Sequence, residues 1–485
     1  MARSFLSFTF ALATATLILF GAEAMPASAQ PATPAASAAA PRARQYPEVQ
    51  EAVQLFGRRQ ISEAIKALEN LSRKNPELPS ARVMAYEILM QMKEPNAARF
   101  QLELAIHITP SDPEPYIILG NIALQDRRIA EATMDFERAK QLLATYPNVS
   151  RKATMEPLTL SGIAQVAEAR EDWKEAESRL REFLRLAPQD LMGHQRLARS
   201  LFWQGKAGDA YDTLKKAKQI DRDSAARNHT KELVMTPEAI MARFYDEFEG
   251  PKSTNPEIWF KAALKTAPDD LATRQEVARW ALDKGKLAFA KEQAEAASKI
   301  EVANSKYSGS NVGHMLRGVV ALWEKDWPEA EQDFQKIILE NPNDSGAKND
   351  IALALVEQED PAKKQRALAY AEANYRDNKN NPDALSTLAW VYFRRNEFEQ
   401  AGAAIEQAVK ASNGNLSNDM ATYLAHILYH RDKKWEAKEL LDSILKDGRP
   451  FSMRPEALKL YEKVKDAARP AEASAPAVPM VTPKP

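Results

Sequence analysis

The sequence has 485 residues, of which 66 are basic, 67 are acidic and none is cysteine. This near-neutral balance gives no long-range attraction to a phosphate backbone, so we expect no nucleic-acid partner. Without cysteine, the chain forms no disulfide, no thiolate metal site and no cysteine nucleophile.

The first 29 residues are typical of a secretory signal. Arg3 supplies a positive charge, and Phe5 to Ala22 is an apolar or small stretch of 18 residues without a charge. Small residues favour cleavage near Ala29, or alternatively near Ala24. We therefore expect a periplasmic or secreted chain that starts at Gln30 and has no transmembrane segment after cleavage. An uncleaved anchor is the alternative, because 18 apolar residues just reach spanning length.

Two Ala/Pro-rich tails bracket a long helical region. Residues 30–44 and 469–485 hold too few large apolar side chains to fold, and we predict that they are disordered. Between them we expect two arrays of helical hairpins, an irregular joint and a polar capping helix. Their ranges are 45–224 for repeats 1–5, 225–236 for the joint, 237–454 for repeats 6–11 and 455–468 for the capping helix.

The hairpins are predicted from a short signature that returns about eleven times. A small residue is followed by a bulky apolar residue four places later, and then by a small or apolar residue three further on. One of the clearest copies is Ala64/Leu68/Leu71. Where no insertion intervenes, the first residues of successive copies fall 34 apart, as Ala64, Ala98 and Ala132 do.

A 34-residue period with this spacing resembles the tetratricopeptide repeat (TPR) family. The resemblance implies an all-α fold, a right-handed superhelical solenoid of about eleven TPR-like helical hairpins. The first helix of each hairpin carries a small residue, such as Gly120 or Gly318, which would let the second helix approach closely. Aromatic residues that begin second helices, among them Trp173 and Phe398, are expected to pack between repeats.

The resemblance also implies a binding groove, because a few first-helix positions of TPR hairpins project into the concave surface. Carried onto this chain, these positions form a stripe of Trp, Tyr, Arg, Met, His and amide side chains. Such residues dominate protein-recognition hot spots. The candidate groove residues are Gln195, Arg199, Trp203, Met241, Tyr245, Arg279, Met315, Trp323, Asn349, Trp390, Arg394, His426 and His430.

Several candidates have a second interpretation. Flat aromatic rings beside Arg and amide groups also suit stacking on sugars, so a polysaccharide ligand stays open. His426 and His430 lie four apart, at a spacing that can hold a metal, but the sequence offers no third ligand and we expect no metal or cofactor. A smoother, less aromatic lining is expected near the N-terminus at Val49 and Phe56. The acidic run from Glu357 to Asp360 is expected to cap helices in a turn.

These patterns favour a scaffold rather than an enzyme. The sequence has no glycine-rich phosphate loop, no Gly-x-Ser-x-Gly and no local Ser/His/Asp grouping, and we expect no catalytic activity. We expect an exported scaffold that holds a protein or peptide segment in its groove and supports an envelope assembly. The alternative is a polysaccharide-binding accessory factor in exopolysaccharide secretion.

Overall fold

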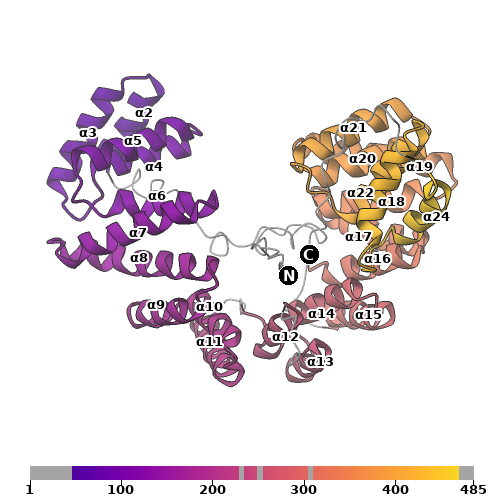
Figure 1. Cartoon of the computed structure of the whole chain (residues 1–485), viewed down its shortest axis with the longest axis horizontal. Helices are drawn as coiled ribbons and strands as arrows, with labels where there is room; N and C mark the ends of the chain where they lie inside the picture. The colour runs from indigo at the N-terminus through magenta and orange to yellow at the C-terminus, as the bar shows by residue number, and fades with distance from the viewer. Residues whose placement is uncertain (1–45, 229–233, 248–254, 304–309, 469–485) are drawn as a thin grey trace, which may run out of the picture. The chain divides into compact units, whose positions relative to one another are not determined.

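The computed structural model describes residues 46–228, 234–247, 255–303 and 310–468. These residues form 23 α-helices and no strand, which confirms the predicted all-α class (Figure 1). The predicted signal and both predicted tails lie outside the described residues. So does part of the predicted joint, although α11 continues through Asn228 and therefore makes its first four positions helical.

The chain divides into two compact units at the boundary between Pro256 and Glu257. The N-terminal unit contains five helix pairs and a single further helix. In chain order, its helices are α2 (Pro47–Gly57), α3 (Ile61–Lys74), α4 (Ala81–Gln91), α5 (Pro95–Ile108), α6 (Glu114–Gln125), α7 (Ile129–Ala144), α8 (Val149–Ala169), α9 (Trp173–Leu186), α10 (Leu191–Trp203), α11 (Ala207–Asn228) and α12 (Pro237–Glu247).

The C-terminal unit begins with a single helix, continues with five pairs and ends with another single helix. Its helices are α13 (Pro256–Thr266), α14 (Leu271–Asp283), α15 (Leu287–Ala303), α16 (Val312–Glu324), α17 (Trp327–Glu340), α18 (Ser345–Val356), α19 (Pro361–Asp377), α20 (Pro382–Arg394), α21 (Phe398–Ala411), α22 (Asn418–His430), α23 (Lys434–Leu445) and α24 (Arg454–Val464). The sixth predicted repeat, α12 and α13, is thus divided between the units.

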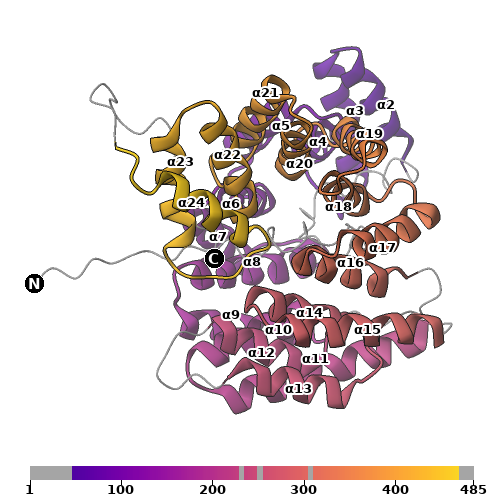
Figure 2. The ribbon, with the colours of Figure 1, turned by 90° about the vertical axis from the view of Figure 1, so that its right-hand side faces the viewer.

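Within each unit the packing is that of a solenoid. The two helices of a pair pack against each other, and the second helix contacts the first helix of the next pair. First helices also contact one another along the array, as α18, α20 and α22 do in turn. We call the surface that they form the first-helix face. At the end of the C-terminal unit, α24 packs on α22 and α23, where we expected a capping helix (Figure 2).

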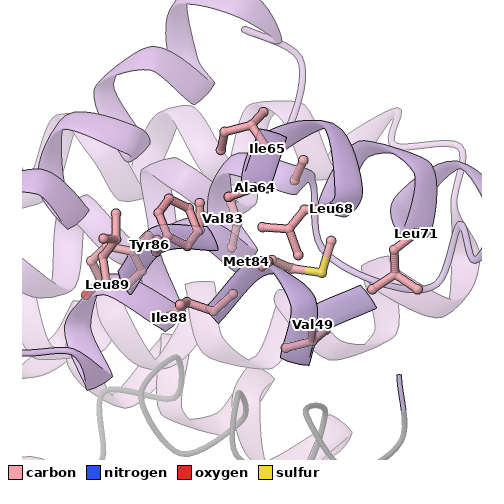
Figure 3. Packing of buried hydrophobic residues seen from close by; sticks show 14 of the residues in the cluster. Val49, Ala64, Ile65, Leu68, Leu71, Val83, Met84, Tyr86, Ile88 and Leu89 are labelled. Atoms are coloured by element: carbon pink, nitrogen blue, oxygen red, sulfur yellow. The ribbon is translucent and has the colours of Figure 1, made fainter. Parts of the chain in front are cut away.

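The repeated signature supplies the core between the helices. Ala64, Leu68 and Leu71 are almost completely buried on α3, where they pack with residues of α2 and α4 (Figure 3). Val49 and Phe56 on α2 belong to the same cluster at 3% and 5% exposure, so they pack the first hairpins and do not form the lining expected there. Burying side chains of this size stabilises the fold by roughly 1.5–3 kcal/mol each.

The small residues of the first helices allow the close approach that the sequence predicts. A Cβ atom placed on Gly318 of α16 would lie 2.6 Å from Cζ of Phe334 on α17. Phe334 is fully buried, so the ring has no room to move away. Gly120 of α6 meets Phe136 of α7 in the same manner, with a contact of 2.9 Å.

No helix in the described part of the chain is both long and apolar enough to cross a membrane.

Candidate partner-binding surfaces

The predicted groove residues all lie on first helices, and the structure distributes them over both units. Those of the N-terminal unit are Gln195, Arg199 and Trp203 on α10, with Met241 and Tyr245 on α12. Those of the C-terminal unit are Arg279 on α14, Met315 and Trp323 on α16, Asn349 on α18, Trp390 and Arg394 on α20, and His426 and His430 on α22. Their burial differs widely, and this decides what a partner can touch.

Three of these residues belong to the core. Met241 is fully buried, Met315 is 6% exposed and Trp390 is 3% exposed. A partner therefore reaches none of them on the surface of the folded chain. Their place in the repeat puts them on a first helix, but the neighbouring hairpins cover them. The other ten are half-buried, apart from the exposed His430.

In the N-terminal unit, one patch of half-buried side chains lies on α9, α10 and α12. We call Trp173, Arg199, Trp203, Tyr245 and Glu247 the Arg199 patch. Trp173 begins α9 directly after its N-cap Asp172, and its ring stacks on that of Trp203 with centroids 5.8 Å apart and planes 16° apart.

The same patch contains an ion pair between neighbouring first helices. The guanidinium of Arg199 lies 3.1 Å from a carboxylate oxygen of Glu247 and 6.0 Å from the ring of Trp173. The side chains of Arg199 and Glu247 are 24% and 21% exposed. Burial raises the pKa of Glu247, and the positive charge of Arg199 opposes that rise. The pair thus holds a positive group over the ring of Trp173, which stacks on Trp203.

Phe202 is a buried residue that packs against the aromatic side chains of the Arg199 patch. It is 5% exposed and lies edge-on to Tyr245, with the two ring centroids 4.8 Å apart. It also packs against Phe244, at 5.4 Å between centroids. Because Phe202 fixes the side of α12 that carries Tyr245, α10 and α12 present a single aromatic surface.

In the C-terminal unit, the corresponding residues form a closed network around Glu357. We call Glu357, Trp390, Arg394, Tyr423 and His426 the Glu357 cluster. Glu357 is the C-cap residue of α18, and its carboxylate accepts a hydrogen bond from Nε1 of Trp390 at 2.8 Å. Its other oxygen lies 3.0 Å from Arg394. The carboxylate therefore ties α18 to α20 by two charge-assisted contacts.

Aromatic stacking continues this network from α20 to α22. The ring of Trp390 stacks on Tyr423 with centroids 4.7 Å apart and on Phe393 with centroids 5.3 Å apart. His426 lies edge-on to Trp390 at 5.4 Å, and its Nε2 atom is buried with no hydrogen-bond partner among the described residues. Burial lowers the pKa of His426 to about 4, so the ring is neutral at neutral pH.

The buried acid Asp350 is hydrogen-bonded to another predicted groove residue, Asn349. Asn349 donates from Nδ2 to Asp350, at 3.3 Å, while its Oδ1 is buried without a partner in the described part of the chain. Asp350 is 8% exposed, and burial raises its pKa to about 7. The pKa rises because the ionised carboxylate loses most of its hydration and gains no nearby cation in return.

The remaining basic candidate, Arg279, and the remaining histidine, His430, contact residues of their own unit. Arg279 pairs with Glu276 at 2.6 Å and with Asp283 at 3.3 Å, both on α14. The exposed His430 stacks on Phe398, with centroids 3.5 Å apart. Within the described ranges, no group of three His, Asp or Glu residues is placed to hold a metal ion.

Sequence reasoning missed the residue that organises the Glu357 cluster. It assigned the run from Glu357 to Asp360 to a turn, and Asp360 does cap α19 by accepting from Ala362 N at 2.8 Å. Glu357 instead points at Trp390, 33 positions later. That separation is close to one repeat. An acidic residue about one repeat before a tryptophan was therefore the sequence pattern that could have predicted this contact.

The geometry defines a helical-repeat scaffold whose first helices carry the polar and aromatic side chains. The tetratricopeptide repeat family model matches residues 349–416, which run from within α18 to beyond α21. This match confirms the resemblance to the tetratricopeptide repeat family that the sequence predicts. A search of curated proteins finds no match to the sequence.

The search of solved structures finds similarity to several chains at low identity. Yeast Tom70 is 15% identical, with a TM-score of 0.36 over 86% of this chain and 94% of its own. A tetratricopeptide repeat protein from Parabacteroides merdae is 15% identical, with a TM-score of 0.37 over 64% of this chain and 99% of its own. YrrB, described as a TPR protein with an unusual peptide-binding site, is 15% identical, with a TM-score of 0.26 over 42% of this chain and 97% of its own.

Proposed function

We propose that this protein is an exported scaffold that binds a segment of a partner protein on its first-helix faces and so supports an assembly of the cell envelope. The observation that carries the proposal is the Arg199 patch. Arg199 and Glu247 are about one-quarter and one-fifth exposed, beside the stacked rings of Trp173 and Trp203. Arg, Trp and Tyr supply large contact area and directional hydrogen bonds at protein interfaces.

Preorganisation is the physical advantage of such a surface. Trp203 is already stacked on Trp173, and Arg199 is already held by Glu247. These side chains lose little further rotamer freedom when a partner arrives, so less of the interaction energy is lost to ordering. A partner with an acidic group would compete with Glu247 for Arg199, and an apolar side chain would cover the paired indoles.

A polysaccharide-binding accessory role is the second candidate, and the stacked pair Trp173 and Trp203 favours it. A flat, half-buried indole pair suits the apolar face of a sugar ring as well as it suits a peptide. The C-terminal unit gives this candidate less support, because Trp390 is 3% exposed and its indole N–H is already bound to Glu357. We therefore place the protein partner first.

Export enters the proposal from the sequence of residues 1–29, with its single early charge and its apolar stretch. Fractionation of cells that express the full chain tests it. A shortened chain outside the cytoplasmic membrane, beginning at Gln30 or after Ala24, supports export. A full-length chain in the cytoplasm overturns it.

The binding function is tested by capture from envelope extract with the chain from Gln30. The test variant combines Arg199→Ala with Trp203→Ala. The matched control is Arg99→Ala, because Arg99 is 45% exposed on α5, a second helix of the same unit. A protein that the wild type and the control capture, and that the test variant loses, supports the proposal. Equal capture by all three overturns the assignment of the patch.

Two further outcomes address the alternatives. Binding to a glycan array, lost in the same double variant and without a captured protein, would replace the protein partner by a polysaccharide. We propose no catalytic activity, and turnover of a simple ester, peptide or glycoside substrate by the purified chain would contradict this.

A further inference from the structure

The segment between α23 and α24 lies against helices that precede it by more than a hundred residues. We call residues Arg449 to Glu456, which include the first turn of α24, the strap. Lys325, the C-cap residue of α16, donates from Nζ to the carbonyl oxygen of Ser452 at 3.0 Å, across 127 positions of sequence. The same Nζ lies 3.4 Å from a carboxylate oxygen of Glu456. The strap therefore contacts the end of α16.

A second anchor lies on a different first helix. Asp419, in the first turn of α22, accepts from the hydroxyl of Ser452 at 2.8 Å and from the backbone N–H of Met453 at 2.9 Å. Lys325 and Asp419 thus bind a carbonyl, a hydroxyl and an N–H of two consecutive residues. The carbonyl and the N–H belong to main chain next to the start of α24, where backbone groups need partners from outside the helix.

Two apolar side chains of the strap are buried in the same region. Phe451 and Met453 are 8% and 6% exposed, while Ser452 between them is half-buried. The strap therefore places two large side chains, two residues apart, into the C-terminal unit and binds their intervening backbone through polar groups. This is how a binding surface of a repeat protein would hold a segment of a partner.

The third point of contact is at α14. Gly285, just beyond the C-terminal end of this helix, has a φ of +68°, and its Cα faces Pro450. A Cβ atom placed on Gly285 would lie 3.4 Å from Cβ of Pro450. The strap consequently joins α14, α16 and α22, which belong to hairpins separated by up to four repeats.

We infer that the strap is a built-in occupant of the C-terminal unit, which a partner segment displaces when it binds there. The inference rests on the proposed function, and it specifies the partner chemistry for this unit. The displacing segment has two large apolar side chains two residues apart, as Phe451 and Met453 are. Its backbone between them offers a carbonyl to Lys325 and an N–H to Asp419.

The form of the anchors is consistent with exchange. The side chains of Lys325 and Glu456 are 26% and 27% exposed, so part of this anchor lies within reach of water, although the paired carboxylate oxygen is itself buried. Residues 448–451 form no helix, and the strap can separate from α14 and α16 without breaking a hairpin. Segments near the end of an array can open locally at free energies below that of global unfolding.

The test locks the strap with an engineered disulfide. The natural sequence has no cysteine, so the two introduced cysteines can pair only with each other within the chain. Gly285→Cys combined with Pro450→Cys places the two Cβ atoms close to the separation of about 3.5–4.5 Å that a disulfide needs. The probe is a labelled peptide of residues 447–466, which carries the strap and α24. Its binding to the full chain is followed by fluorescence anisotropy under oxidising and reducing conditions.

The expected result is binding to the reduced double variant and none to the oxidised one. In a second variant, Phe451→Ala with Met453→Ala weakens the strap within the chain. We expect the peptide to bind this variant about tenfold or more tightly than the wild type, because the binding-competent fraction rises. Gly285→Cys alone controls for the strained glycine position, and far-UV circular dichroism verifies that each variant is folded.

Three results would overturn the inference. Failure of the disulfide to form would contradict the position of the strap. Equal peptide binding by the oxidised and reduced forms would mean that the peptide binds elsewhere. A weakened-strap variant that is folded but gains no affinity would make the strap a permanent part of the core. The peptide is a segment of this chain, so these results do not depend on whether the extract experiment captures a partner.

Discussion

Replacing Trp390 by alanine tests whether this predicted groove residue is part of the core. Its side chain is 3% exposed, stacks on Tyr423 and Phe393, and donates to Glu357 at 2.8 Å. Removal of a buried tryptophan costs about 3–5 kcal/mol in proteins. The substitution also leaves the carboxylate of Glu357 without one of its donors. We therefore expect Trp390→Ala to destabilise the C-terminal unit by at least about 3 kcal/mol.

The comparison variant is Trp203→Ala in the Arg199 patch. Trp203 is half-buried and stacks on Trp173, and such an aromatic pair contributes about 0.5–1.5 kcal/mol beyond area burial. We expect a loss of roughly 1–2 kcal/mol, smaller than that at Trp390. Trp390→Phe separates the two contributions at Trp390, because it keeps a ring and removes the donor to Glu357.

The assay is urea unfolding followed by circular dichroism, combined with hydrogen exchange of α10 and α20. Exchange is needed because a repeat array can unfold in parts, which makes one global midpoint ambiguous. Faster exchange throughout α20 in Trp390→Ala, with α10 changed less in Trp203→Ala, is the expected result. A loss at Trp390 no larger than that at Trp203 would refute the reasoning.

Three further predictions concern buried titratable groups and a buried glycine. Asp350 has a folded pKa of about 7, raised from its ordinary value of 3.8. Between these two pH values the folded state keeps the proton that the unfolded chain has lost. The free energy of unfolding therefore falls as pH rises towards 7. Asp350→Asn should therefore gain stability over the wild type between pH 4 and pH 8, by up to about 4 kcal/mol in urea titrations. His426 has a folded pKa of about 4, so its contribution to the stability of the folded state is lost as pH falls from about 6.5 to 4. Its NMR signal should not titrate above about pH 5. An inflection near pH 6.5 would contradict its burial. Gly318→Ala should cost about 1–3 kcal/mol through the 2.6 Å contact with Phe334, whereas Gly208→Ala, with no atom within 4 Å, should leave stability unchanged or improve it.

The fold could be predicted because the information is local and repeated. Ala64, Leu68 and Leu71 lie on one face of one helix, and each is almost fully buried against its immediate neighbours. A residue in this position needs only the hairpin before or after it, so a 34-residue period specifies its environment. The close approach at Gly318 follows from the same rule, since the ring that it meets is in the same hairpin.

Burial on the first-helix face could not be predicted in this way. Trp203 and Trp390 both lie on first helices, yet the first is half-buried and the second is core. The difference arises from residues one repeat away on either side. Glu357 approaches Trp390 from the preceding first helix, and Tyr423 approaches it from the following one. A position in the period identifies the face, but the side chains of three consecutive repeats decide whether that face is open.

The strap lies beyond what any periodic pattern can predict. A repeat period encodes contacts between neighbours, whereas Lys325 and Ser452 are 127 positions apart. Such a contact forms only after several hairpins have stacked in the correct order, so it reports on the array as a whole. The polar groups that hold the strap, Lys325 and Asp419, lie at the end of one first helix and the start of another, where backbone groups are unsatisfied. In the C-terminal unit, the directional groups that hold the strap therefore lie at helix termini, whereas in the N-terminal unit Arg199 lies within α10.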